Sequence, residues 1–267
     1  MAAVFYVIAL GGCAETNKPL GKLLGALRSM TPAEAARQAF DLYDADKRRQ
    51  GVTALDAAPF GGEEAYVRMY RVLVDDDDPT VRAACIKALG RHGNVEDAQI
   101  LIDALSNPAE MSIVRWEAAK ALGMIHNPIA ISPLCAAVNT HKEEADADVR
   151  IAAADALGQY AKPVVVQVLI GALNDRDFGV VLASHHSLYI LTGQNFGTSS
   201  EDWLHWVEGH NNQLFEDQRA YTYKPYKKPK GLMDKIKFWK QDEPIKPLVP
   251  KGLDTQTSNA VDRPPSY

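Results

Sequence analysis

A ten-residue pattern that recurs every 33 to 35 residues constrains the fold of this chain more than any other feature. Three copies align without gaps, and they read VRAACIKALG at 81–90, VRWEAAKALG at 114–123 and VRIAAADALG at 149–158. An earlier copy ends at Asp56 (KRRQGVTALD) and a later one at Gly193 (SLYILTG). Five units therefore cover residues 32–193, and a period of this length is typical of stacked helical repeats.

The recurring segment itself predicts a helix. Its apolar residues are 3, 4 and 7 positions apart, as Val81, Cys85, Ala88 and Leu89 show, which places them on one helix face. Many of the residues on this face are alanines, so neighbouring helices can approach closely. A glycine follows the leucine in four of the five units, and we expect it to close the helix in the left-handed conformation.

Further apolar segments between these helices predict a partner helix for each of them. They span 62–76, 95–106, 127–141 and 162–175. The stretch TPAE at 31–34 predicts the start of the first helix, with a threonine cap, a proline in the first turn and a glutamate in capping-box position. No segment shows the sustained two-residue alternation of a strand. The sequence therefore predicts an all-α chain of helical hairpins.

The units resemble HEAT repeats, in particular the short bacterial type called PBS-lyase HEAT-like repeats, in which an acid and Val-Arg precede an Ala-rich helix that ends in Ala-Leu-Gly. The resemblance implies a right-handed α-solenoid of about five hairpins, with a ladder of acids and arginines along the stack. The ladder positions hold Asp44, Arg48, Asp78, Arg82, Arg115, Asp146 and Arg150. His185 takes the arginine position in the last unit, so we expect the ladder to stop there.

The acids of the ladder also precede predicted helices, where capping and the helix dipole favour them. The run VDDDDPTVR at 74–82 is therefore interpreted as a capped turn with Pro79 at the first helical position. A calcium site is the alternative, but the run lacks the alternating ligand spacing of an EF-hand loop.

The segment after the last unit, residues 191–218, resembles the ending of many bacterial HEAT-repeat proteins, with Leu-Thr-Gly followed by Trp-x-x-Trp. A solenoid leaves the apolar face of its final hairpin uncovered and needs a cap. We expect Trp203 and Trp206, together with Val207, to cover that face from one helix. A ligand-binding aromatic box is the alternative for these tryptophans.

The N-terminus begins with a short apolar run, and VFYVIALGG at 4–12 is too short to span a bilayer. Its length suits the hydrophobic region of a signal sequence. The four residues Leu-Gly-Gly-Cys that end at Cys13 resemble the lipobox of bacterial lipoproteins, which implies cleavage before Cys13 and lipid attached to it. Residues 1–12 would then be a signal segment and 13–30 a tether. An uncleaved hydrophobic segment and a frayed terminus remain alternatives.

Charge is distributed unevenly along the chain. Residues 219–267 hold eleven Lys/Arg and five acids, which gives +6 and leaves −11 for residues 1–218 out of a total of −5. Residues 219–240 form a basic amphipathic segment that we expect either to contact an anionic membrane or to pack on the acidic repeats. The candidate membrane-contact residues are Lys227, Lys228, Lys230, Lys235, Lys237 and Trp239. Residues 241–267, rich in Pro, Thr and Ser, are predicted to be disordered.

The residue types that catalysis or metal binding would need are scattered. Cys85 and Cys135 fall on predicted apolar helix faces, and three cysteines in total form neither a disulfide framework nor a zinc spacing. Deoxyhypusine hydroxylase, a HEAT-repeat enzyme, binds iron through His-Glu pairs, and no such dipeptide occurs here. We also find no GxSxG, HExxH or P-loop motif, so we predict no catalytic residue, cofactor or metal site.

These features favour a non-enzymatic adaptor, namely a membrane-tethered lipoprotein whose solenoid presents an extended surface to a protein partner. The predicted solenoid, including its capping helix, spans residues 31–218. We expect a monomer in the cell envelope that does not bind nucleic acid, or a cytoplasmic protein if residues 1–12 are not a signal. Two alternatives remain, namely a phycobilin-lyase-like or other enzyme that handles a prosthetic group, and a purely structural envelope lipoprotein.

Overall fold

The computed structural model describes residues 30–139, 146–210, 213–226 and 245–253, and those from Pro32 onward belong to one compact unit. The described residues of this unit form eleven α-helices and two short 3₁₀ helices, and they form no strand beyond two isolated bridges. The helices are α2 Pro32–Ala39, α3 Ala45–Ala57, α4 Glu64–Leu73, α5 Pro79–His92, α6 Ala98–Ser106, α7 Ser112–Leu122, α8 Ile131–Val138, α9 Ala147–Leu157, α10 Pro163–Ala172, α11 Phe178–Thr192 and α12 Ser200–Gly209. The 3₁₀ helices η1 Val95–Asp97 and η2 Pro128–Ala130 lead into α6 and α8.

Several predicted residues fall outside this description. They are the lipidation site Cys13 and the membrane-contact candidates Lys227, Lys228, Lys230, Lys235, Lys237 and Trp239.

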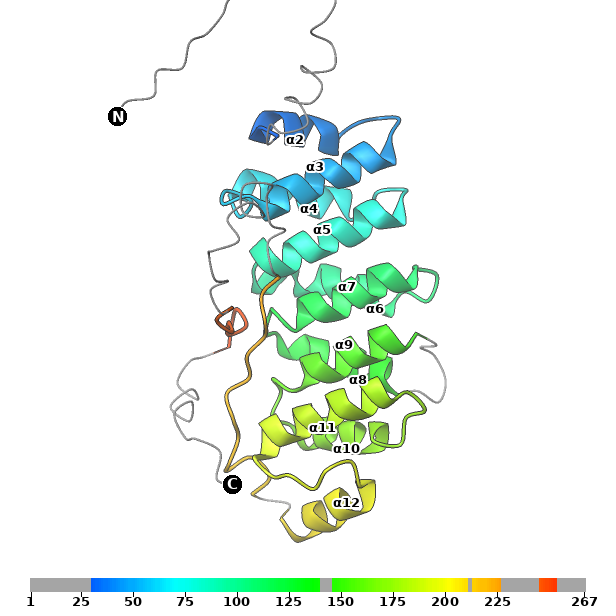
Figure 1. Cartoon of the computed structure of the whole chain (residues 1–267), viewed down its shortest axis with the longest axis vertical. Coiled ribbons are helices and arrows are strands. Elements are labelled where there is room, and N and C mark those ends of the chain that lie inside the picture. The colour runs from blue at the N-terminus through cyan, green and yellow to red at the C-terminus, as the bar shows by residue number, and fades with distance from the viewer. Residues whose placement is uncertain (1–29, 140–145, 211–212, 227–244, 254–267) are drawn as a thin grey trace, which may run out of the picture. The chain divides into compact units, whose positions relative to one another are not determined.

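The helices form five hairpins that stack in chain order, as the sequence predicts (Figure 1). The second helix of each hairpin, from α3 to α11, packs on the second helices of the neighbouring hairpins, and these five make up layer A. The first helices, from α2 to α10, make up layer B. The protein is therefore an all-α solenoid.

The apolar faces predicted for the recurring segment are the core of this stack. Val81, Cys85 and Leu89 are completely buried, and Val149 and Leu157 take the same positions two hairpins later. Burying a side chain of this size contributes about 1.5–3 kcal/mol relative to leaving it exposed. Since no single hairpin can cover its own face, each depends on its neighbours.

The glycines that follow the recurring leucines do not adopt the left-handed conformation that the sequence predicts, except for Gly193 (φ 71°). Gly90 lies inside α5, and Gly123 and Gly158 have helical φ values of −70° and −58°. Gly90 is needed for close packing instead, because a Cβ there would lie 2.7 Å from the Cβ of an alanine on α7. A Cβ on Gly158 would lie 2.9 Å from a serine hydroxyl on α11.

The acids at the predicted ladder positions cap their own helices. Asp44 accepts a hydrogen bond from the backbone N–H of Lys47 (3.1 Å), Asp78 from that of Thr80 (2.8 Å), and Asp146 from that of residue 148 (2.9 Å). The acidic run that includes Asp78 is thus a capped turn, with proline as the first residue of α5.

The arginines of the ladder join neighbouring repeats instead of pairing with the acid four residues earlier. Three of the four guanidinium groups each donate two hydrogen bonds to an acid in the loop that precedes the next layer A helix. The pairs are Arg48 with Asp76 (2.7 and 2.8 Å), Arg82 with Glu110 (2.8 and 2.6 Å) and Arg150 with Asp175 (3.0 and 3.0 Å). The guanidinium of Arg115 contacts the backbone carbonyl of residue 110.

The ladder ends at the fifth hairpin, but the residue at the arginine position is Val181 rather than His185. Asp177 caps α11, and the ladder arginines stand four residues after the cap, as Arg150 does after Asp146. His185 lies one turn further along α11, where its Nε2 is 2.9 Å from Oδ1 of Asn195.

The capping helix α12 lies against α10. Trp203 is fully buried there, and its indole N–H donates to the carbonyl of Gly197 (2.9 Å). The ring of Phe196 meets it edge-on with 5.0 Å between centroids, and Trp206 lies 6.2 Å away at right angles. The aromatic side chains of this segment therefore contact one another at the end of the stack.

Candidate functional site

An extended C-terminal segment runs back along the stack from α12 toward α5 (Figure 1). We call the described parts of this segment, residues 213–226 and 245–253, the strap. The prediction that 241–267 is disordered is wrong for 245–253, because this stretch finds backbone partners on the repeats. The N–H of Lys251 donates to the carbonyl of Met124 (2.9 Å), and the N–H of His126 donates to the carbonyl of Lys251 (2.7 Å).

Further contacts hold the strap at both ends of its course. The N–H of Arg219 donates to the carbonyl of Ile190 on α11 (2.7 Å). Tyr223 and Leu248 exchange two backbone hydrogen bonds of 2.9 Å, which join the two parts of the strap. At the other end, the ammonium of Lys251 donates to the carbonyls of Arg91 (2.9 Å) and Gly93 (2.6 Å) at the C-terminal end of α5. The strap thus links the second hairpin to the fifth.

Tyr226 is the strap side chain with the most polar and cationic contacts. Its hydroxyl donates a 2.6 Å hydrogen bond to Oε2 of Glu117, which is buried on α7. The ammonium of Lys87 lies 4.2 Å, and that of Lys120 4.6 Å, from the centre of its ring. Such cation–π contacts are worth about 0.5–2 kcal/mol each. Of the two predicted positions for the basic segment, the described part up to Tyr226 lies on the repeats.

A cavity of about 400 Å³ lies between α7, α9 and the strap. Trp116 of α7 and the strap residues Tyr221, Tyr223 and Tyr226 give it aromatic walls. Its volume falls within the range of sites that hold small molecules or side chains. None of its three elements forms the cavity alone, so the site depends on the strap.

Lys120 lies in this cavity with its charge already compensated. Its ammonium is 3.7 Å from the centre of the Trp116 ring and 3.2 Å from a carboxylate oxygen of Glu117. Burial lowers the pKa of Lys120, although Glu117 acts in the opposite direction. The aromatic walls therefore already hold one ammonium group that belongs to the chain itself.

Two carboxylates that line the cavity, those of Asp148 and Asp155 on α9, form no ion pair with any residue in the described part of the chain. Asp155 is reached by solvent, yet the protein around its carboxyl removes enough hydration to raise its pKa. The charge of His186 on α11 opposes this shift. The cavity also holds one exposed ammonium without an ion-pair partner among the described residues, that of Lys224.

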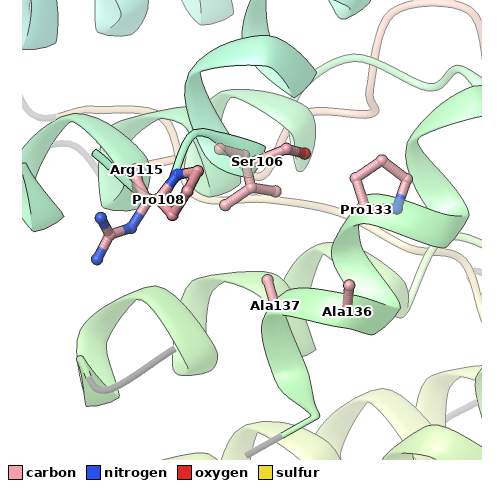
Figure 2. A pocket seen from close by; sticks show the side chains of 7 residues that line it. Ser106, Pro108, Arg115, Pro133, Ala136 and Ala137 are labelled. Atoms are coloured by element: carbon pink, nitrogen blue, oxygen red, sulfur yellow. The ribbon is translucent and has the colours of Figure 1, made fainter. Parts of the chain in front are cut away.

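A smaller pocket of about 160 Å³ lies in layer B, where Figure 2 shows Ser106 and Pro108 across from Ala136 and Ala137 of α8. Arg115 lines the same pocket. Its volume is below the range of about 300–1,000 Å³ that is typical of ligand sites. The larger cavity under the strap is therefore the stronger candidate site.

Other kinds of site find less support within the described ranges. No group of three or more His, Cys, Asp or Glu side chains there is arranged to hold a metal ion. No helix in the same ranges has both the length and the apolar character to cross a membrane. Cys85 is buried, Cys135 is half-buried, and burial raises the pKa of both thiols, in the case of Cys135 to about 11. Both are therefore poor nucleophiles.

Comparison with known families agrees with the geometry. The family model for HEAT repeats matches residues 33–112, 71–145 and 109–188, which together cover more than half of the chain. The chain belongs to the HEAT-repeat family. HEAT repeats generally mediate protein–protein interaction, and the match spans the hairpins from α2 to α11.

No curated protein matches the sequence. Among solved structures, the complex of CpcE and CpcF of phycocyanin lyase from Nostoc sp. PCC7120 is 20% identical over 61% of this chain and 98% of that chain, with a TM-score of 0.45. The designed armadillo repeat protein YIII(Dq)4CqI is 16% identical over 70% and 95%, with a TM-score of 0.45. Human deoxyhypusine hydroxylase in complex with glycerol is 18% identical over 65% and 90%, with a TM-score of 0.26. Likenesses of this degree assign no activity to the present chain.

Proposed function

We propose that this protein is a non-catalytic interaction scaffold that binds a protein partner on the strap side of its solenoid, while lipid on Cys13 tethers it to a membrane of the cell envelope. One observation carries the choice of side. This surface already binds an extended segment, its own strap, through backbone hydrogen bonds at Met124 and His126 and through the buried contact of Tyr226 with Glu117. A surface that binds one extended peptide has the features needed to bind another.

The cavity beside the strap supports the same choice. It is about 400 Å³ in volume, and the bound strap forms one of its walls. A partner that inserts a side chain there meets rigid aromatic walls, which cost little conformational entropy on binding. Stacked helical repeats commonly offer such extended surfaces to their partners.

The alternative of an enzyme that handles a prosthetic group would be favoured by a polar pocket in which histidines and acids converge. Among the described residues that line the cavity, the titratable groups are Asp148, Asp155, two lysines and three tyrosines, without a histidine. No observation therefore favours the enzyme over the scaffold. A purely structural role differs from both in predicting no selective partner.

Site-specific photo-crosslinking in the native host tests the scaffold proposal. A photoreactive amino acid replaces Lys224, which is exposed at the cavity, or Ser132, which is exposed on α8 in layer B. We expect one dominant protein adduct from position 224 and none of that mass from position 132. Equal labelling from both positions, or no adduct from either, would contradict binding on the strap side.

Mass spectrometry of the native protein tests the tether separately. We expect a chain that begins at Cys13 and carries the added mass of attached acyl groups. A native chain that retains Met1 without an acyl modification would refute the lipid tether and leave the scaffold proposal standing.

A further inference from the structure

We propose that the cavity under the strap binds a basic side chain, lysine or arginine, from an extended segment of the partner protein, with the carboxylate of Asp155 as its counter-ion. This inference rests on the proposed function, since it names the chemistry by which the partner is recognised.

The walls of the cavity suit a cation with an apolar stem. Trp116, Tyr221 and Tyr223 present aromatic surface to the cavity, and aromatic faces attract ammonium and guanidinium groups while they pack against methylene chains. The chain itself provides an example, because Lys120 already lies with its ammonium against Trp116 and Tyr226. An added lysine or arginine would extend this pattern toward α9.

The charges of the cavity also call for a cation. Glu117 compensates Lys120, so the charges left without a partner among the described residues are the carboxylates of Asp148 and Asp155 and the ammonium of Lys224. Negative groups thus outnumber positive ones by two to one, and both carboxylates belong to exposed residues that a ligand can reach. A bound cation would offset the partial loss of hydration that raises the pKa of Asp155.

Longer-range electrostatics point to the same ligand. Residues 1–218, which include the whole solenoid, carry a net charge of −11. An acidic body attracts basic segments and speeds their encounter, particularly at low ionic strength. Residues 1–218 are thus acidic in sum, and so are the unpaired groups of the cavity.

The test titrates the full-length protein with blocked pentapeptides that differ only in the central residue of Ac-Gly-Ala-X-Ala-Gly-NH₂, where X is lysine, arginine, norleucine or glutamate. Binding is followed by the indole N–H signal of Trp116 in ¹H–¹⁵N spectra. We expect the lysine and arginine peptides to shift this signal, with norleucine about tenfold or more weaker because it lacks the charge. Equal binding of the norleucine peptide, or no binding of any peptide, would overturn the inference.

A matched pair of variants tests the counter-ion. Asp155→Asn should weaken the basic peptides about tenfold to a hundredfold, the range for loss of a charge-assisted hydrogen bond. Asp103→Asn is the control, because Asp103 is an exposed acid on α6 in layer B that does not line the cavity and whose contact is with Gln99. Unchanged affinity in Asp155→Asn would assign the binding to another group and refute the proposal.

A third variant distinguishes a partner from the chain's own lysines. Replacement of Lys227, Lys228 and Lys230 by glutamine should leave peptide affinity within about twofold of the original protein. If the basic peptides bind only to this variant, the natural occupant is the chain itself and the inference is wrong. A negative result in the peptide titration or in the Asp155→Asn comparison would refute only this inference. The scaffold proposal is tested separately, by photo-crosslinking at position 224.

Discussion

Removing the charge of Asp175 should destabilise the solenoid more than any exposed charge change. Nε and Nη2 of Arg150 each lie 3.0 Å from an oxygen of this carboxylate. The side chains are only 1% and 0% exposed, so neither can recover hydration if the other is lost. Breaking such a pair costs about 3–5 kcal/mol. We therefore expect Asp175→Asn to lower the free energy of unfolding by about that amount, measured by urea denaturation and circular dichroism.

Two further variants separate the loss of the partner from the value of the pair. In Arg150→Met with Asp175→Leu no buried charge remains, so we expect less than half the cost of Asp175→Asn alone. Asp46→Asn is the exposed control, since this carboxylate is 74% exposed beside an arginine, and it should change stability by less than about 1 kcal/mol. The reasoning is refuted if Asp175→Asn costs no more than Asp46→Asn, or if the double replacement costs as much as the single one.

The pH dependence of the same variant provides a check. Burial by itself raises the pKa of the Asp175 carboxyl, but the hydrogen bonds from Arg150 and from the N–H of residue 177 outweigh it, so the pKa lies below its usual value of 3.8. A carboxyl with a lowered folded pKa stabilises the fold above its unfolded pKa, and that contribution is lost as the pH falls through the folded pKa. The stability difference between the original protein and Asp175→Asn should therefore be full near pH 7 and shrink below about pH 3.8.

Three other changes give sharp expectations. Gly90→Ala places a Cβ 2.7 Å from an alanine Cβ of α7, so it should lower the free energy of unfolding by about 1–3 kcal/mol. At Gly171 nothing lies within 4 Å of an added Cβ, so Gly171→Ala should stabilise α10 by about 0.5–1 kcal/mol. If both variants change stability in the same direction in urea unfolding, the packing role of Gly90 is contradicted. Asp155→Asn should raise the thermal midpoint of unfolding at pH 7, because the raised pKa of this carboxyl means that the fold disfavours its ionised form. The gain should vanish below about pH 3.8, where the carboxyl is protonated in both the folded and the unfolded chain. A lowered midpoint would show that the carboxylate stabilises the fold. Tyr226→Phe keeps the ring but loses the 2.6 Å hydrogen bond to Glu117. Hydrogen exchange of the strap amides should then show an opening free energy that is about 1–2 kcal/mol lower. Unaltered exchange would mean that the hydroxyl does not stabilise the strap.

The hairpins could be predicted from the sequence because their information is local. Periods of 3, 4 and 7 within VRAACIKALG define a helix face, and the recurrence of that face every 33 to 35 residues defines the stack. The capped turn at Asp78 could be predicted for the same reason, since a cap contacts only the next few residues.

The ladder partners and the glycines were harder to predict because they depend on neighbouring repeats. Arg48 and Arg82 each pair with an acid 28 residues later, whereas Arg150 pairs with one 25 residues later, so the offset is not fixed by the sequence pattern. Gly90 follows Ala-Leu and the left-handed Gly193 follows Leu-Thr, but neither local sequence shows how close a neighbouring helix lies. The close approach of α7 is what makes Gly90 necessary for packing.

The candidate site was missed because the sequence leaves open whether its third wall, in the basic segment 219–240, contacts a membrane or packs on the repeats. The strap is rich in lysine and proline, which favour solvated chain, and its contacts lie more than a hundred residues away on α5 and α7. One signal was present, since Tyr221 and Tyr223 are two residues apart, as on one face of an extended segment. Both line the cavity with Tyr226.

The cavity exists only if the strap lies on the repeats, and hydrogen exchange on the full-length protein measures this most directly. The amides of Tyr223, Leu248 and Lys251 donate to backbone carbonyls at 2.9 Å, and that of His126 donates at 2.7 Å to the carbonyl of Lys251. We predict that all four exchange far more slowly than in the isolated peptides. Exchange of the three strap amides at the rate of free peptide, with the helices still protected, would show an open strap and contradict the proposed site.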